Sequence, residues 1–198
     1  MLPQHYTYSI PSLLDKYHVG DPLGRFFDRL MALNRQINLV SRETSRANLD
    51  RLAAESLLPL EILGTEFRTY LDIGSGGGFP AVPLMLAIGR LESAVLFERT
   101  RKKARALQGL LEDLGLAAQV LDRNFEDHGP VAPAELVTLR LVKLTPRLLD
   151  AALQACCPGG KFVCWSAPGF DCTDYSFETV QYALTEDQAV KSLTIFAK

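Results

Sequence analysis

A run of glycines that could hold a nucleotide lies in the segment LDIGSGGGFP, residues 71–80. It follows a short apolar stretch typical of a strand and precedes a stretch typical of a helix, which is the context that a nucleotide-binding turn requires. Gly74, Gly76 and Gly78 lack a Cβ, so their backbone can turn tightly and approach a ligand closely. Asp72, at the end of the expected strand, could orient this turn or accept a hydrogen bond from a ligand amine. The segment therefore predicts a site for a nucleotide or nucleoside.

The spacing within the turn argues against two common kinds of nucleotide site. A dinucleotide fingerprint G-x-G-x-x-G that begins at Gly74 would need glycine at position 79, where the chain has Phe79. A P-loop would need Gly-Lys followed by Ser or Thr, and the turn contains no lysine. The pattern D-x-G-x-G-x-G instead resembles the first motif of the class I methyltransferases that use S-adenosylmethionine (SAM). That resemblance implies SAM as the cofactor.

A carboxylate at the end of the next expected strand supports a nucleoside ligand. Glu98 follows Gly78 by about 20 residues, the separation at which an acid in nucleoside-binding folds accepts hydrogen bonds from the ribose hydroxyls. The alternative is a solvated cap on the helix that begins near Arg99. Because the glycine turn and the acid occur together at the right separation, we expect the ribose role.

The elements that must position these residues follow from the spacing of apolar residues. From Tyr70 onward, short apolar runs alternate with helical stretches, which is typical of βαβ units and a parallel sheet. Strands are expected at residues 70–73, 94–97, 119–121, 136–139 and 161–165, helices at 82–88, 101–114 and 146–155, and an antiparallel pair of strands at 179–183 and 192–197. The prediction for residues 65–198 is an α/β, Rossmann-like methyltransferase domain with a mostly parallel seven-stranded sheet.

Residues 1–64 are expected to form a helical extension packed on this core. Asp21-Pro22 is a helix-start signal, an N-cap acceptor followed by proline at the first helical position. Apolar residues then recur at helical spacing from Leu23 to Ile37. A second helix is expected from about Ser45 to Leu58, because Pro59 disfavours its continuation.

Composition limits the class of protein. The 198 residues carry 21 Lys plus Arg and 23 Asp plus Glu, a net charge of −2 that argues against a uniformly basic binder but allows a local basic patch. The chain lacks an apolar run of about 18 residues and an N-terminal secretory pattern, so we expect a cytoplasmic protein without membrane association. The four cysteines form no C-x-x-C pair and the three histidines are scattered, so we expect reduced thiols and no metal.

A more specific resemblance extends from about Leu23 to the C-terminus. LDIGSGGGFPAVPL, with a proline directly after Phe79, resembles the motif of the glucose-inhibited division protein B family, methyltransferases that act on N7 of a guanine in 16S ribosomal RNA. Four other segments resemble the family: RLMALNRQINLVS (29–41), ESLLPL (55–60), VLFERTRKKARAL (95–107) and ELVTLRLVKL (135–144). The resemblance implies a SAM-dependent methyltransferase that acts on 16S ribosomal RNA or the small ribosomal subunit, and we expect a monomer.

The resemblance also implies which residues contact the cofactor: Gly74, Phe79, Asn124, Phe125 and Arg140. The family usually has Ala-Glu or a similar pair where this chain has Asn124-Phe125, so Glu126 is an alternative contact. A family histidine ahead of the ESLLPL segment and a family lysine after the fifth strand are absent here. These departures leave open a relative that acts on another substrate, or a non-catalytic protein that binds SAM or RNA.

The chemistry of this reaction does not call for a catalytic dyad or triad. N7 of guanine has an exposed lone pair and no proton, so in-line displacement at the sulfonium needs no general base. The protein would align and dehydrate the reacting pair. We therefore assign no catalytic acid or base, and Arg140 could hold the cofactor carboxylate or a target phosphate, or could make a surface salt bridge.

A polyanionic acceptor predicts a basic surface beside the cofactor. Five basic residues follow Glu98 closely and are assigned to RNA binding: Arg99, Arg101, Lys102, Lys103 and Arg105. Contacts from such residues to phosphates dominate the affinity for RNA. The alternative is an ordinary solvated helix face balanced by Glu112 and Asp113. Trp165 could stack on a base or lie in the core.

Overall fold

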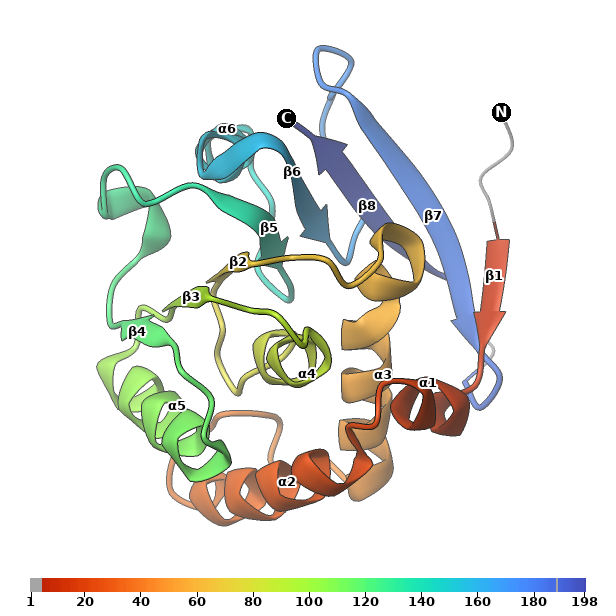
Figure 1. The fold of residues 1–198 in the computed structure, drawn as a ribbon, viewed down its shortest axis with the longest axis vertical. Coiled ribbons are helices and arrows are strands. Elements are labelled where there is room, and N and C mark those ends of the chain that lie inside the picture. Colours follow the sequence, from red (N-terminus) through yellow and green to blue (C-terminus); the bar gives the residue numbers. More distant parts are fainter. Residues whose placement is uncertain (1–4, 188) are drawn as a thin grey trace.

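The computed structural model describes residues 5–187 and 189–198 (Figure 1). Its helices and strands, in chain order, are β1 (His5–Tyr8), α1 (Ile10–Lys16), α2 (Gly20–Asn34), α3 (Arg46–Leu63), β2 (Thr69–Ile73), α4 (Ala81–Ala87), β3 (Ser93–Phe97), α5 (Arg101–Leu114), β4 (Gln119–Leu121), the 3-10 helix η1 (Phe125–Asp127), β5 (Ala134–Leu139), α6 (Pro146–Gln154), β6 (Cys156–Cys164), β7 (Phe177–Leu184) and β8 (Lys191–Ala197). The strands and helices predicted after residue 65 are all present. Residues 1–4 of the predicted extension lie outside the described residues.

The eight strands of the described chain form one sheet, in the order β1-β7-β8-β6-β5-β2-β3-β4. β8 runs antiparallel to β6 and β7, and the other neighbouring strands are parallel, so the predicted mostly parallel sheet is confirmed. The predicted number of seven strands is one too few, because β1 pairs with β7 in the region expected to be all-helical. Four residues are too short to show a period-2 pattern, so the sequence hid this strand.

Helices cover the two faces of the sheet unequally (Figure 1). Helices α1 to α5 lie against one face, while α6 and η1 lie on the other. Successive residues of β2 serve the two faces in turn, as the pleat requires. Tyr70 packs into the core beneath α1 to α5, and its neighbour Leu71 packs into the core beneath α6.

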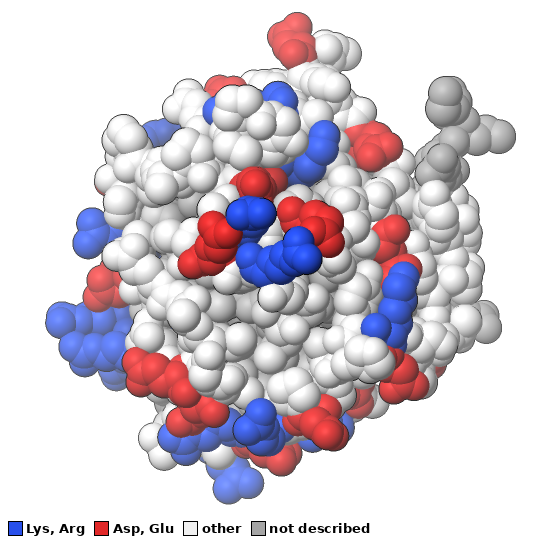
Figure 2. Space-filling model, in the orientation of Figure 1, with Lys and Arg blue, Asp and Glu red and all other residues white. Residues whose placement is uncertain are grey.

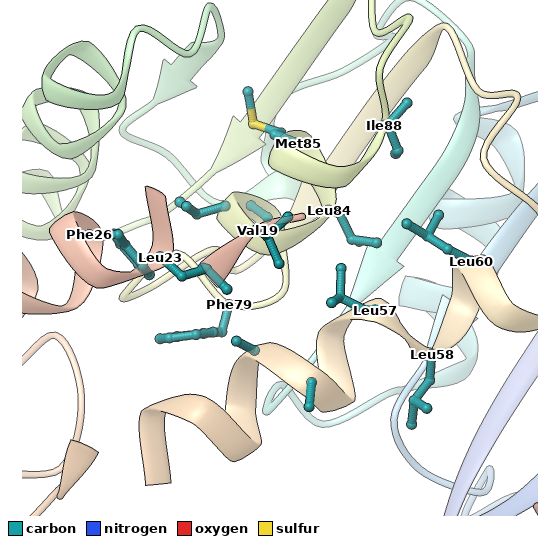
Figure 3. Packing of buried hydrophobic residues seen from close by; sticks show 14 of the residues in the cluster. Val19, Leu23, Phe26, Leu57, Leu58, Leu60, Phe79, Leu84, Met85 and Ile88 are labelled. Carbon is teal, nitrogen blue, oxygen red and sulfur yellow. The ribbon is translucent and has the colours of Figure 1, made fainter. Parts of the chain in front are cut away.

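The N-terminal helices share one hydrophobic core with the sheet. Phe26 and Phe27 of α2 and Leu57 of α3 are fully buried in the same cluster as Phe79 of the glycine-rich turn (Figure 3). Helices α1 to α3 therefore pack on the sheet through a shared buried cluster. The division of the chain into units at residue 64 stays a prediction.

Helix α3 continues through Pro59 to Leu63, so the predicted end at Leu58 is wrong. A proline has no N–H to donate to the carbonyl four residues earlier, which here belongs to Glu55. That oxygen instead accepts a hydrogen bond from Nε1 of Trp165 at 2.9 Å. A side chain from the end of a distant strand thus satisfies the carbonyl that the proline leaves free.

Helix α2 also differs from the prediction at both ends. Its N-cap is Val19, with no side-chain cap, and Asp21 lies within the first turn, where a carboxylate still favours the positive end of the helix dipole. The helix ends at Asn34, whose Oδ1 accepts hydrogen bonds from the N–H groups of Leu39 and Val40 at 2.8 and 3.0 Å. These bonds turn the chain toward the carboxyl ends of the central strands.

We predict that Phe26→Ala lowers the free energy of unfolding by about 3–5 kcal/mol, because it opens a cavity in the core beneath the glycine turn. The centroids of the Phe26 and Phe79 rings are 5.4 Å apart. Urea denaturation measures the change. Met31→Ala, at an exposed position of the same helix, is the control and should change it by less than about 0.5 kcal/mol. Equal effects would contradict a shared core.

Candidate functional site

The carboxyl ends of β5, β2 and β3 meet at one edge of the sheet. Ile73 of β2 pairs with Phe97 of β3 on one side and with Leu139 of β5 on the other. The next residues of the three strands, Gly74, Glu98 and Arg140, therefore leave the sheet at the same level. In open parallel sheets, ligands bind outside this edge.

A cavity of about 1000 Å³ opens there, at the upper end of the usual range of about 300–1000 Å³ for small-molecule sites. Its walls are the glycine turn, the loops that follow β3, β4 and β5, the segment between α2 and α3, and the first half of α3. More basic than acidic residues line it: Arg51, Arg99, Lys103, Arg123, Arg140 and Lys143 against Glu43, Glu98 and Glu126. The lining therefore favours anionic groups.

The glycine turn is tied to β3 by backbone hydrogen bonds. The N–H groups of Gly74 and Ser75 both donate to the carbonyl of Phe97, at 2.8 and 2.9 Å. Gly74 has a φ of +77°, in the left-handed region that glycine adopts without strain. A Cβ at this position would lie 2.5 Å from Cγ2 of Val142. Gly74 is thus required both by its backbone and by the closeness of the loop after β5.

Glu98 joins the glycine turn to the start of α5. Its Oε2 accepts the N–H of Gly76 at 3.0 Å, and its Oε1 accepts the N–H of Thr100 at 2.7 Å. The residue is buried at the cavity wall, so it is not the solvated cap of the alternative interpretation. Each carboxylate oxygen has a second lone pair. Both oxygens can therefore accept ligand hydroxyls while they hold the two loops.

A buried chain of hydrogen bonds lies beneath the turn. Oγ1 of Thr138 donates to Oδ1 of Asp72 at 2.6 Å, so the hydroxyl of Tyr70, 2.7 Å from the same Oγ1, must be the donor to it. Oδ2 of Asp72 has no hydrogen-bond partner among the described residues. Burial raises the pKa of Asp72 to about 6, and the bond from Thr138 opposes this rise. Asp72 does not line the cavity, which suits the predicted role of orienting the turn.

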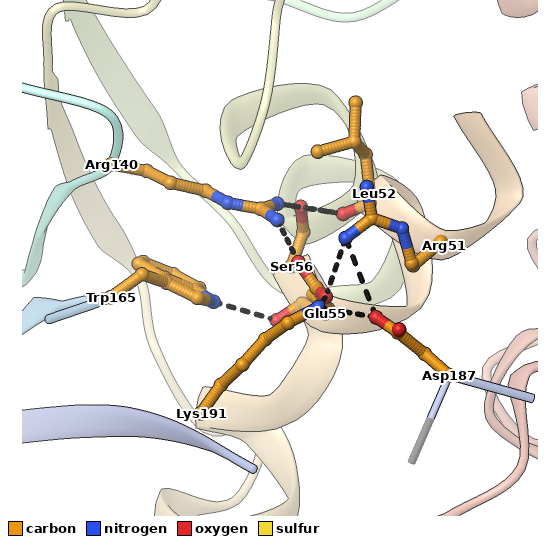
Figure 4. Close-up of polar contacts among 8 residues, drawn as sticks. All are labelled: Arg51, Leu52, Glu55, Ser56, Arg140, Trp165, Asp187 and Lys191. Atoms are coloured by element: carbon orange, nitrogen blue, oxygen red, sulfur yellow. Dashed lines mark hydrogen bonds and ion pairs between the residues drawn. The ribbon is translucent and has the colours of Figure 1, made fainter. Parts of the chain in front are cut away.

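Arg140 is buried and held by α3 (Figure 4). Its Nη1 donates to the carbonyl of Leu52 at 2.8 Å and to Oγ of Ser56 at 3.0 Å, and its Nη2 forms an ion pair with Glu55. The guanidinium also lies 5.5 Å from the centre of the Trp165 ring. Burial lowers the pKa of Arg140, and the charge of Glu55 opposes this. The salt bridge is therefore a buried one, and it fixes one wall of the cavity.

Glu55 is the centre of a cluster that the sequence analysis missed. Besides Arg140, its carboxylate contacts Nζ of Lys191 at 2.6 Å and Nη1 of Arg51 at 3.3 Å. Lys191 also pairs with Asp187 at 2.7 Å. These residues come from parts of the chain that are far apart in the sequence: α3, the end of β5 and the start of β8. The one feature of the sequence that could have indicated this cluster is a glutamate, Glu55, on the apolar side of α3.

Seven of the predicted cofactor residues line the cavity: Gly74, Gly76, Phe79, Glu98, Asn124, Phe125 and Arg140. The alternative contact Glu126 lines it too. Gly78 does not, because it faces the core, where a Cβ would lie about 3 Å from the side chains of Val82 and Phe26. Phe79 is mostly buried, with its ring against Phe26 and Phe27. Contact of these residues with a cofactor stays a prediction.

The predicted RNA-binding residues divide between the cavity and the surface. Arg99 and Lys103 line the cavity, while Arg101 pairs with Asp122 at 3.6 Å and Lys102 and Arg105 lie outside the lining. Figure 2 shows basic and acidic side chains side by side on most of the face drawn, with a group of basic ones at the left edge, where Figure 1 places α5 and β4. The binding of RNA by the five residues stays a prediction.

Trp165 takes the core alternative rather than a place in the cavity lining. Its ring packs against the cluster beneath α1 to α5, and its N–H is held by the carbonyl of Glu55. The sequence analysis did not single out the cavity residues of the segment between α2 and α3, nor those directly after Arg140. Both groups line the cavity from irregular segments, which have no periodic pattern to reveal them.

In the part of the chain that the structure describes, no group of three or more His, Cys, Asp or Glu residues is arranged to hold a metal ion. The same part contains no helix of the length and apolarity that a membrane crossing needs. All four cysteines are free.

The fold and the site define a class I methyltransferase, with its glycine turn and carboxylate at adjacent strand ends and its antiparallel strand near the sheet edge. A family model described as GidB, rRNA small subunit methyltransferase G, matches residues 21–168. The chain belongs to this family.

Relatives named ribosomal RNA small subunit methyltransferase G match most of the chain. That of Solibacter usitatus is 30% identical over 159 residues, which cover 80% of this chain and 75% of the relative. That of Acidiphilium cryptum is 37% identical over 143 residues, 70% of this chain and 64% of the relative. A solved structure of an O-methyltransferase from Bacillus cereus in complex with SAH has a TM-score of 0.66 at 16% identity, covers 95% of this chain and 99% of that one, and shows the likeness of fold.

We predict that Asp72→Asn removes a pH dependence of stability between pH 4 and 6. Because the folded protein binds the Asp72 proton more tightly than the unfolded chain does, this group favours folding most below pH 4, and the contribution is lost as the pH rises through 6. The wild type should therefore lose roughly 2 kcal/mol relative to the variant from pH 4 to pH 7. Urea denaturation at each pH measures this difference. A constant difference would contradict the raised pKa.

We predict that Glu55→Gln lowers the free energy of unfolding by about 3–5 kcal/mol, because it leaves the buried guanidinium of Arg140 without an opposite charge. The matched control is Asp113→Asn, which breaks an exposed ion pair with Arg29 at 2.9 Å and should cost less than about 1 kcal/mol. Both losses are measured by urea denaturation at neutral pH. If the two variants lose similar amounts, the Glu55 cluster does not hold α3 to β5.

Proposed function

We propose that this chain transfers the methyl group of SAM to N7 of a guanine in 16S ribosomal RNA. The observation that carries the proposal is the joining of the glycine turn to Glu98 at the wall of a large cavity, in a member of the rRNA small subunit methyltransferase G family. The turn and the acid suit an adenosyl group. The family supplies the class of acceptor.

The residues around the cavity fit SAM as the cofactor. Glu98 has free lone pairs on both carboxylate oxygens for the two ribose hydroxyls. The backbone at Gly76 can approach the ligand closely because no Cβ intervenes, whereas the corresponding space at Gly74 is filled by Val142. Bound SAM supplies the methyl group on a sulfonium. Asp72, buried behind the turn with one oxygen unpartnered, adds negative charge on the side of the cofactor site.

The reaction asks this chain for alignment rather than for acid–base chemistry. Transfer of a methyl group from bound SAM would carry the positive charge from sulfur to the base, so no residue of this chain would need to take up or release a proton. The anchored guanidinium of Arg140 and the bonds that tie the turn to β3 keep the cavity walls in place without a substrate. Such preorganisation of the reacting pair is the main contribution that the protein makes here.

The basic residues of the cavity lining and of α5 suit a polyanionic acceptor. Arg99 and Lys103 face the cavity, and Arg101, Lys102 and Arg105 extend the positive charge along the helix. Phosphate contacts of this kind give RNA affinity that falls steeply with salt. We also infer that the chain works as a monomer in the cytoplasm, where its four free thiols stay reduced.

The direct test uses 16S ribosomal RNA and small subunits from cells that lack the endogenous enzyme of this family. The chain is incubated with radiolabelled SAM, and N7-methylguanine is mapped by mass spectrometry. We expect one labelled guanine in 16S RNA, and none in large-subunit RNA. Binding of SAM without labelling would overturn the proposal in favour of a non-catalytic relative.

We predict that Glu98→Gln weakens the binding of SAM. The amide nitrogen cannot accept a hydrogen bond, so the variant loses acceptors for the ribose and for the two loops. We expect its affinity for SAM, measured by calorimetry, to fall at least about tenfold, which is roughly 1.4 kcal/mol. Glu92→Gln, at an exposed ion pair with Arg68, is the control and should bind SAM as the wild type does. Equal affinity in both variants would remove Glu98 from the site.

A further inference from the structure

Leu141, directly after Arg140, has two features that are unfavourable for an isolated leucine. Its φ is +59°, in the left-handed region that side chains with a Cβ avoid. Its side chain is 88% exposed, although it lies in the lining of the cavity. The only other non-glycine residue with positive φ among the described residues is His18. Histidine is one of the types that adopt this region more often, and leucine is not.

The neighbours of Leu141 explain why the backbone turns at this point. Arg140 on one side is held by the carbonyl of Leu52 and by Glu55 of α3. Val142 on the other side occupies the space above Gly74, where a Cβ would come within 2.5 Å of its Cγ2. Leu141 therefore lies between an anchored arginine and a valine that covers the glycine turn. Glycine would adopt this backbone conformation without strain, so only the side chain of Leu141 distinguishes it from the residue that the backbone favours.

Strained backbone that persists in a folded protein gathers at sites of function. The exposed apolar residues other than Leu141 and Val142, such as Met31 and Val190, lie outside the cavity lining, and single exposed apolar residues need no special explanation. Leu141 differs from them because exposure, strain and position in the cavity occur together. Val142, also exposed, continues the apolar surface beside it.

We propose that Leu141 and Val142 form the apolar wall against which the acceptor base lies during methyl transfer. This inference rests on the proposed function and names how that site takes its acceptor. Because Val142 packs over Gly74, a base against this wall would lie beside the turn that holds the cofactor. The exposed cations of Lys143 and Arg123 in the same lining are available to phosphates on either side of the base.

A base can lie flat on such a wall only when it is removed from its stack. Apolar and aromatic side chains commonly hold unstacked bases in RNA-binding proteins and in enzymes that modify bases. The wall therefore predicts that the acceptor guanine is in a single-stranded or flipped-out nucleotide. A guanine fixed inside a helix would keep its face against neighbouring bases and could not reach Leu141.

The test compares Leu141→Gly, Leu141→Asn and Leu141→Met with the wild type. Glycine relieves the strain and removes the side chain, asparagine keeps a similar size and tolerates the left-handed region but is polar, and methionine keeps an apolar surface. We expect an equal or higher unfolding midpoint for Leu141→Gly. SAM affinity should stay within about twofold in all three variants. Methylation of 16S ribosomal RNA, as kcat/KM, should fall at least about tenfold for glycine and asparagine and less than about threefold for methionine.

Met31→Ala is the control for loss of an exposed apolar side chain and should leave SAM affinity and the kcat/KM for methylation unchanged. Full activity of Leu141→Gly or Leu141→Asn would overturn the acceptor wall and leave the proposed function intact. Weakened SAM binding in these variants would also overturn it, because it would place Leu141 in the cofactor site. A wild type that binds SAM but methylates no ribosomal RNA would overturn the proposed function together with the wall.

Discussion

The register between β2 and its two neighbours is the constraint on which the whole site depends. Because Ile73 is level with both Phe97 and Leu139, the glycine turn, Glu98 and Arg140 begin at the same edge. A slip of β2 by one residue would turn its core residues to the opposite face of the sheet and move the glycine turn out of line with Glu98 and Arg140. The hydrogen bonds from Gly74 to β3 and from Gly76 to Glu98 then hold the turn in this place. The position of the cavity thus depends first on the pairing of β2 with β3 and β5.

Helix α3 makes the opposite wall of the cavity part of the same rigid unit. The carbonyl of Glu55, which Pro59 leaves free, binds Trp165. The carbonyl of Leu52 and the side chains of Glu55 and Ser56 bind Arg140. Two strand ends are therefore fastened to one helix by buried polar groups, which are costly to break because their partners would stay desolvated. Leu141, whose φ is +59°, directly follows the anchored Arg140.

The sequence was sufficient where structure depends on local pattern. The glycine turn, the strands that flank it and α5 were predicted nearly to the residue, because apolar periodicity and glycine spacing define them. It was insufficient where partners are remote. β1 is a strand because it pairs with β7. Helix α3 continues past Pro59 with the free carbonyl bound by Trp165. The buried charge of Glu55 is balanced by Arg140 and Lys191. The cavity residues on irregular segments, Leu141 above all, were also not predicted, because their place in the cavity depends on remote partners.

The most direct test of the account is a crystal structure of the chain with S-adenosylhomocysteine bound. The account predicts that both ribose hydroxyls lie within hydrogen-bond distance of the Glu98 carboxylate, about 2.5–3.0 Å. The adenosyl group should also lie in the cavity against the backbone of Gly76. A ligand bound elsewhere, or a Glu98 carboxylate that contacts only the N–H groups of Gly76 and Thr100 in the complex, would contradict it.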